Sequence, residues 1–246
     1  SLIITEPTCI SLLDYASHGE FLTQKSVTEK QAHIVATVKL SNAATTKQVN
    51  VKVTVKDHDK TIQEIKRHVT LNAHSEGETI IPFTIQNPRL WNGREDPFMY
   101  RAEISLWEND KLLDKVIQPL GIRYYRVDPD NGFFLNGKHL PLYGVCRHQD
   151  RAEIGNALRS MHHEEDTELM LEMGVNAVRL AHYQQAEYMY DLMDQSGIIT
   201  CRHRSYRLRD FQENRIRTIE RSNPPKLHSP LNLFLGIIQR IDRTRR

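Results

Sequence analysis

The chain contains little cysteine and no long apolar run, and both features narrow its class. Only three of its 246 residues are cysteine, and Cys9, Cys146 and Cys201 lie far apart. This spacing gives neither a disulfide framework nor a CxxC metal site, so we expect isolated, mostly buried thiols. No apolar segment approaches the roughly 18 residues of a membrane span, which predicts no membrane partner. The chain opens on Ser-Leu-Ile, without a methionine or a basic segment, so no signal peptide is visible.

Charge is balanced overall but unevenly distributed. The formal net charge is +2, with 39% hydrophobic and 26% charged residues, as in an ordinary soluble globular protein. Residues 1–200 carry 21 basic and 27 acidic side chains, whereas residues 201–246 carry 12 and 4. A change of sign this sharp predicts a boundary near residue 200.

Residues 1–122 have the period-two pattern of β-strands. Residues 34–40 and 51–55 alternate between an apolar set and a more polar one, which buries one face of a strand and wets the other. Further strand-like runs cover residues 64–71, 79–85, 99–107 and 112–118. Asn109-Asp110 is placed to form a tight turn between the last two. Strands of this length and spacing predict an antiparallel sandwich of immunoglobulin type.

Residues 123–200 change to alternating strand and helix patterns. Asn136-Gly137, with apolar residues on both sides, predicts a hairpin closed by a type I′ turn. Two short apolar runs follow and end in polar clusters, Gly144-Val-Cys-Arg-His-Gln-Asp150 and Asn176-Ala-Val-Arg-Leu-Ala-His-Tyr183. A helical segment lies between them, and we place Glu164–Asp166 in its first turn, where the helix dipole favours acidic groups.

A second helical segment, residues 186–195, and a third apolar run from Ile198 complete a β-α-β-α-β order. This order predicts a parallel sheet with helices outside it. In a β/α barrel, the functional residues project from the carboxyl ends of the strands.

Four stretches together resemble glycoside hydrolase family two, the β-galactosidases, β-glucuronidases and β-mannosidases. They are the two polar-ended runs, the hairpin Phe133-Phe-Leu-Asn-Gly-Lys138, and Pro88-Arg-Leu-Trp91 with Pro97-Phe-Met-Tyr100. The β-galactosidase branch fits best. The resemblance implies an immunoglobulin-like β-sandwich over residues 1–122 and a truncated TIM (β/α) barrel over residues 123–200. For Trp91 and Tyr100 we favour packing over contact with a sugar.

The resemblance also implies a substrate-binding shell. His148 would follow the first barrel strand, and Arg179 and His182 the second. The two histidines would donate hydrogen bonds to sugar hydroxyls, while Arg179 would orient and ionise the nucleophilic carboxylate. Asp150 either contacts substrate or caps the following loop.

Two neighbours of these residues are expected to be structural. For Arg147 we favour an ion pair within the barrel, and for Tyr183 we favour packing.

Retaining hydrolysis of a glycosidic bond needs two carboxylates about 5–5.5 Å apart. The resemblance implies an acid/base from an Asn-Glu pair after the fourth barrel strand and a nucleophilic Glu after the seventh. The sequence contains no Asn-Glu dipeptide. We therefore assign no catalytic residue and expect this chain alone to be inactive.

A metal site is not expected in this chain. His162-His163 beside Glu164-Glu165 could be a metal cluster, but adjacent helical residues point about 100° apart, so a solvated helix start is favoured. Family members often use magnesium or sodium through residues absent here, so we predict no cofactor.

Residues 201–246 depart from the family pattern. The third strand should end in a tryptophan and an acidic residue, yet it runs into Cys201-Arg-His-Arg-Ser-Tyr-Arg-Leu-Arg209. We favour an out-of-frame or mis-predicted gene end over a divergent ending or a basic arm that binds nucleic acid. No nucleic-acid-binding motif accompanies the arginines.

The sequence therefore predicts part of a retaining hydrolase of terminal β-D-galactosides, with a β-galactoside or related glycan as partner. The alternatives are a non-catalytic carbohydrate-binding or scaffold module and a nucleic-acid-associated protein. The full-length parent could form a homo-oligomer. The compartment stays open, because unpaired cysteines favour a reducing interior while bacterial polysaccharide degraders are often exported.

Overall fold

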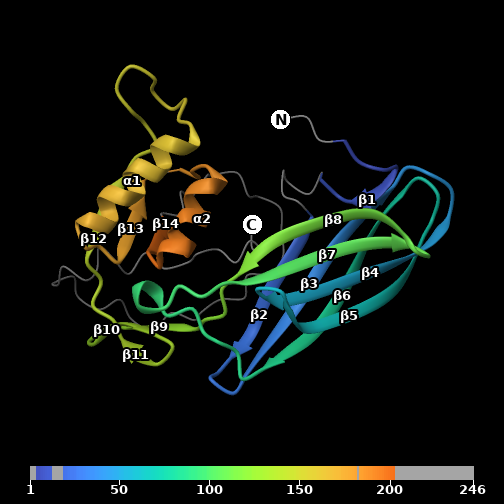
Figure 1. The fold of residues 1–246 in the computed structure, drawn as a ribbon, viewed down its shortest axis with the longest axis horizontal. Helices are drawn as coiled ribbons and strands as arrows, with labels where there is room; N and C mark the ends of the chain where they lie inside the picture. Colours follow the sequence, from blue (N-terminus) through green and yellow to red (C-terminus); the bar gives the residue numbers. More distant parts are fainter. Residues whose placement is uncertain (1–3, 13–18, 182, 203–246) are drawn as a thin grey trace, which may run out of the picture.

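A computed structural model describes residues 4–12, 19–181 and 183–202 of the chain. An elongated β-sandwich lies beside a smaller α/β unit (Figure 1). Both parts of the predicted fold class, an immunoglobulin-like antiparallel sandwich and the beginning of a TIM barrel, are confirmed. Neither helix in the described residues is long and apolar enough to cross a membrane.

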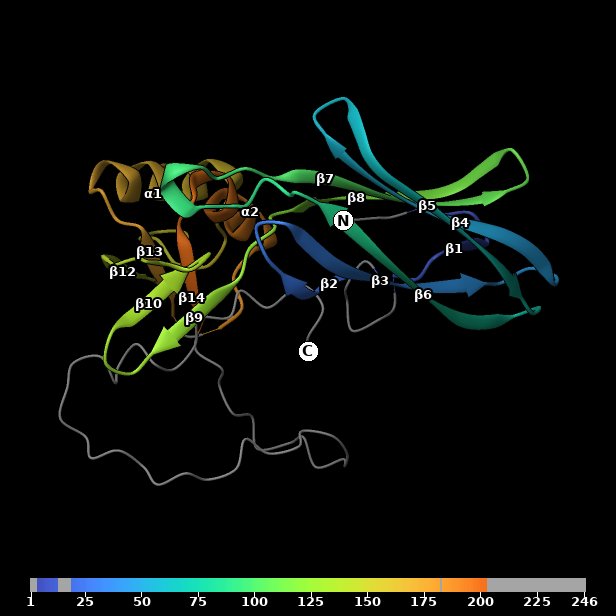
Figure 2. The ribbon, with the colours of Figure 1, turned by 90° about the horizontal axis from the view of Figure 1, so that it is seen from below.

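The sandwich consists of two antiparallel sheets that face each other across one apolar core (Figure 2). In the first sheet, β3 (Gln31–Asn42) pairs along one edge with β6 (Ser75–Gln86), and along the other with β1 (Thr8–Ile10) and β2 (Glu20–Val27). The second sheet has the order β5 (Lys60–Leu71), β4 (Lys47–Asp57), β7 (Tyr100–Glu108), β8 (Lys111–Leu120).

The strands of this sandwich form where the alternating pattern predicts them. Every second residue of β3, from Ala32 to Leu40, is buried, while its neighbours are only half-buried. In β4 the valines from Val49 to Val55 point into the same core. The predicted turn at Asn109 joins β7 to β8, and its φ of 53° lies in the left-handed region that asparagine tolerates.

A small three-stranded sheet follows the sandwich, made of β9 (Tyr125–Asp128), β10 (Gly132–Leu135) and β11 (Lys138–His139). The predicted hairpin turn is confirmed, since Asn136 has φ 49° and Gly137 has φ 81°. The Asn136 amide nitrogen also donates to the Trp91 carbonyl at 2.9 Å. The hairpin is thereby attached to a segment that leaves the sandwich.

The α/β unit has the predicted element order, β12 (Gly144–Arg147), α1 (Ser160–Glu172), β13 (Ala177–Leu180), α2 (Glu187–Ser196) and β14 (Ile199–Arg202). Its three strands are parallel and adjacent in the order β12-β13-β14. The two helices cover one face of this sheet (Figure 1). Gly174 and Gly197, with φ of 72° and 71°, follow the helices as the sequence predicted.

The start of α1 was predicted wrongly. The helix begins at Ser160, four residues before Glu164, so the acidic side chains lie beyond its first turn. The Nδ1 atom of His162 accepts the Arg159 backbone N–H at 3.1 Å, in the role that Glu or Gln takes in a capping box. Histidine is not the usual residue there, which is why the pattern did not reveal it.

A second apolar cluster joins the sandwich to the barrel unit. Trp91, which is 2% exposed, packs with residues of β10, β13 and β14, namely Phe133, Leu135, Ala177 and Ile199. Its indole N–H donates to the Asp194 carbonyl at 2.8 Å. Trp91 is therefore a packing residue, as expected.

The 3-10 helix η1 (Gly93–Glu95) follows Trp91 and lies against the end of α2. A Cβ atom on Gly197 would lie only 2.2 Å from the Gly93 carbonyl oxygen, so the two backbones approach closely here.

Candidate functional site

The carboxyl ends of β12 and β13 lie side by side. The parallel register pairs Cys146 with Arg179 and Arg147 with Leu180, so the strands end level with each other. The residues that follow them, beginning with His148 and Ala181, therefore enter neighbouring loops. This is the edge of the sheet where barrel enzymes carry their functional side chains.

The two faces of the sheet have different surroundings, because side chains alternate along a strand. Val178 and Leu180 pack against the helices. Ala177 and Ile199 face the opposite way and are covered by Trp91 and the hairpin. On this second face, Trp91 and the hairpin thus cover the amino end of the sheet. Arg179 lies nearer the carboxyl end of its strand.

On that face Arg179 lies between Cys146 of β12 and Cys201 of β14. It is half-buried, and its Nη1 atom lies 3.9 Å from the Cys146 sulfur. Burial raises the pKa of the Cys201 thiol to about 11, against the opposing effect of the Arg179 charge. Cys9 and Cys201 are buried as expected, but Cys146 is exposed, which corrects the expectation for that thiol.

The structure brings three of the four predicted site residues to the same end of the sheet. His148 and Asp150 are exposed in the loop after β12, and Arg179 is the penultimate residue of β13. His182 lies outside the described residues. The sugar-binding roles of all four stay predictions.

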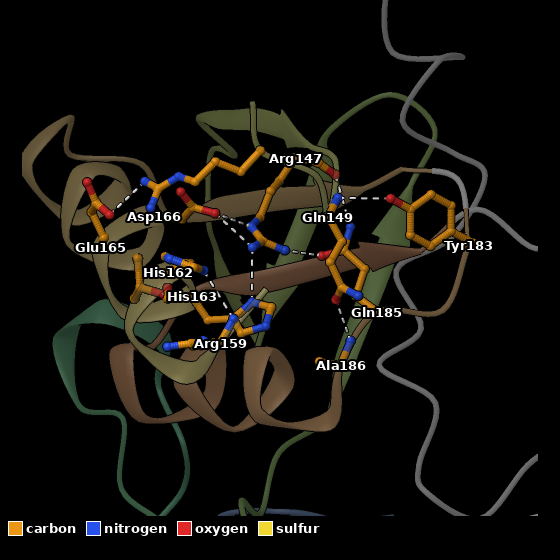
Figure 3. Close-up of polar contacts among 12 residues, drawn as sticks. Arg147, Gln149, Arg159, His162, His163, Glu165, Asp166, Tyr183, Gln185 and Ala186 are labelled. Atoms are coloured by element: carbon orange, nitrogen blue, oxygen red, sulfur yellow. Dashed lines mark hydrogen bonds and ion pairs between the residues drawn. The ribbon is translucent and has the colours of Figure 1, made fainter. Parts of the chain in front are cut away.

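Arg147 points to the helical side and forms the predicted ion pair. Its side chain is 6% exposed, and its Nε and Nη2 atoms both donate to Oδ2 of Asp166 on α1, at 2.9 and 2.7 Å (Figure 3). Nη2 also reaches Nδ1 of His163, at 3.0 Å, and Nη1 donates to Oε1 of Gln185. A buried guanidinium with all of these partners is satisfied, so Arg147 is not available to substrate.

His163 does not form the solvated helix start that the sequence predicted. It is 3% exposed and lies against Arg147, and burial followed by the Arg147 charge lowers its pKa. Within the described residues, no group of three or more His, Cys, Asp and Glu side chains could hold a metal ion.

Sequence reasoning also missed Gln149 and Gln185, which join the loops after β12 and β13. Glutamine in a loop carries no pattern of its own. Its partners here lie more than 30 positions away in the chain, so only the fold reveals them.

Comparison with known families accounts for most of the chain. The model of glycosyl hydrolases family 2 matches residues 19–123, and the model of that family's TIM barrel domain matches residues 127–225. The chain belongs to glycosyl hydrolases family 2. The family 2 barrel match extends past residue 200, where the charge pattern placed a boundary. Residues 203–246 lie outside the described part, so the origin of this tail stays a prediction.

The chain resembles relatives that are named for two different activities. A beta-glucuronidase of Bacteroides fragilis is 59% identical over 199 residues, which are 81% of this chain and 29% of that protein. A beta-galactosidase of Bacteroides ovatus is 30% identical and aligns with 74% of this chain and 21% of its own length.

Solved family 2 structures share the fold. A putative beta-galactosidase from Bacteroides fragilis has a TM-score of 0.78 and 38% identity, covering 80% of this chain and 29% of that one. A Bacteroides uniformis beta-glucuronidase has a TM-score of 0.77 and 32% identity, covering 80% and 24%. The chain thus spans less than a third of the length of these relatives.

Proposed function

We propose that this chain forms the sandwich and the first barrel strands of a retaining β-glycosidase. Terminal β-D-glucuronides are the first candidate for its substrate class. The observation that carries this is the 59% identity to a beta-glucuronidase over the segment that contains His148 and Arg179. The sequence alone favoured β-galactosides. They remain the second candidate, because the putative beta-galactosidase structure is 38% identical.

The proposed chemistry divides between this chain and later barrel strands. The two carboxylates of a retaining glycosidase lie about 5–5.5 Å apart, one as acid and base, the other as nucleophile. This chain supplies the shell around them. Arg179 donates charge-assisted hydrogen bonds to the nucleophile, which keeps that carboxylate ionised. His148 donates a directed hydrogen bond to a sugar hydroxyl.

We expect no turnover of an aryl β-glucuronide or an aryl β-galactoside by the purified 246-residue chain. The reason is that the sequence holds no Asn-Glu pair to act as acid and base. The measurement is release of the aryl alcohol, with a mock purification from the same host as control. Turnover that follows the protein through every purification step would contradict the proposal. Saturable binding of a β-glucuronide without turnover would instead support the sugar-binding module.

A chimera tests the function of the site itself. Residues 19–202 would replace the aligned segment of the Bacteroides fragilis beta-glucuronidase, and the aryl β-glucuronide should be hydrolysed. Arg179→Ala in this chimera should lower kcat by about 10²–10³-fold, the usual cost of losing one preorganised donor. Arg67→Ala, at an exposed arginine of β5, is the matched control and should leave kcat unchanged.

The outcomes of this experiment are distinct. A folded chimera that hydrolyses only the β-galactoside would move the second substrate class ahead of the first. A folded chimera that hydrolyses neither would refute the proposed activity. Equal rates for the two arginine variants would refute the role of Arg179 alone.

A further inference from the structure

The loops that follow β12 and β13 are joined by reciprocal hydrogen bonds. Arg147, the last residue of β12, donates from Nη1 to Oε1 of Gln185 in the second loop. The Gln185 amide nitrogen returns a hydrogen bond to the Arg147 carbonyl at 3.1 Å, and the Ala181 N–H donates to the same carbonyl at 2.9 Å. One arginine thus holds the second loop through both its side chain and its backbone.

A second pair of hydrogen bonds joins the loops just beyond Arg147. The Gln149 N–H donates to the Tyr183 hydroxyl at 3.0 Å, and the Ala186 N–H donates to Oε1 of Gln149 at 2.6 Å (Figure 3). We call Arg147, Gln149, Tyr183 and Gln185 the loop clamp. His148 lies between two of its members in sequence, and position 182 lies beside Tyr183. The clamp therefore fixes the backbone on both sides of His148, one of the proposed sugar-contacting residues.

His163 completes the clamp in only one protonation state. The guanidinium of Arg147 can only donate, so Nδ1 of His163 must accept, which requires a neutral imidazole with its proton on Nε2. The other titratable groups near this ring are Asp166 and His162 of α1 and Tyr188 of α2, whose ring centroid is 6.4 Å away. A protonated ring could not accept and would repel the guanidinium. Asp166, already bonded twice to Arg147, favours the protonated form only in part.

We propose that Arg147 is a positioning residue that holds the loop carrying His148 against the loop after β13, and that a proton on His163 loosens this hold. The inference rests on the proposed function, because the positioned groups are the proposed sugar contacts. The sign follows from the ring's environment. Burial and the Arg147 charge lower the pKa of His163 below its ordinary value. The clamp is therefore intact at neutral pH and loosens as pH falls through that lowered pKa.

The test uses NMR on the 246-residue chain without any sugar. The ring signals of His163 and the backbone amides of Gln149 and Ala186 would be followed as pH is lowered. We expect all three to shift with one shared midpoint, below that of an exposed histidine. His163→Asn keeps an acceptor for Arg147 but does not titrate, so both amides should lose this transition. His68→Asn, at an exposed histidine of β5, should leave it unchanged.

Two results would overturn the inference: amides that do not titrate with the His163 ring, or a transition that persists in the His163→Asn variant. If that variant does not fold, Tyr183→Phe provides the check, since it removes only the hydroxyl that accepts the Gln149 N–H. The Gln149 amide should then lose its response while the Ala186 amide keeps it. An unchanged Gln149 response would also overturn the inference. These measurements need neither sugar nor turnover, so they stand apart from the chimera assays.

Discussion

Replacing Trp91 with alanine should lower the free energy of unfolding by about 3–5 kcal/mol, the range for a large aromatic side chain removed from a core. The indole is 2% exposed and packs on residues of three separate strands. Its removal leaves a cavity between the sandwich and the barrel unit. It also leaves the Asp194 carbonyl without the indole N–H that it accepts. The loss should fall mainly on the barrel unit, because the core of the sandwich is a separate cluster.

Urea unfolding followed by circular dichroism measures the total loss, and amide hydrogen exchange shows where it falls. Exchange should accelerate in β13 and β14 and stay slow in β3 and β4. Trp91→Phe is the control, since it keeps most of the buried ring surface and loses the hydrogen bond, at a cost of about 1 kcal/mol beyond the smaller ring. If the alanine variant were no less stable than the phenylalanine variant, the junction would not depend on the indole.

Replacing Arg147 with methionine should cost about 3 kcal/mol, the lower end of the range for removing one partner of a buried ion pair, because the Asp166 side chain is 29% exposed. Methionine fills much of the volume but supplies no donor. Asp166 would lose both of its hydrogen bonds to Arg147, and Gln185 would lose the donor to its Oε1 atom. The penalty comes chiefly from these unpaired groups, because the net energy of the intact pair is small.

The control for Arg147 is a neighbouring arginine with an exposed partner. Nη2 of Arg151 lies 2.6 Å from Oε2 of Glu165, and the two side chains are 33% and 53% exposed. Arg151→Met should therefore cost less than about 1 kcal/mol. Both variants would be unfolded with urea at pH 7, where His163 is neutral. Equal losses for the two variants would show that the Arg147 pair behaves as a surface pair.

The sequence predicted those parts of the fold that short-range patterns encode. The alternation in β3 and β4 states directly which side chains are buried, and Asn136-Gly137 specifies its turn through positive φ angles. β2 was not predicted, because buried and exposed residues stop alternating in its second half. The register of its pairing with β3 also shifts between Gln24 and Ser26. A bulge of this kind breaks the period-two signal.

The candidate site was predicted only where a motif carried it. The polar clusters after β12 and β13 pointed to the correct edge of the sheet, and Arg147 was correctly expected in an ion pair. The partners that surround Arg147 were not foreseen. Gln185 and His163 are 38 and 16 positions away, and their roles depend on the packing of α1 and the loops against the strand. No local pattern records such contacts.

The backbone contact between Gly93 and Gly197 limits how freely the two parts of the molecule can be recombined. At this point η1 and the end of α2 approach more closely than any side chain would permit. Gly197 cannot be exchanged, because a methyl group there would meet the Gly93 carbonyl at 2.2 Å. At Gly93 the nearest atom to such a methyl group is 3.4 Å away, and it is the φ of 62° that favours glycine. A hybrid that takes its sandwich from one parent and its barrel from another must therefore inherit a compatible pair. The sandwich and the first barrel strands are best treated as one exchangeable block.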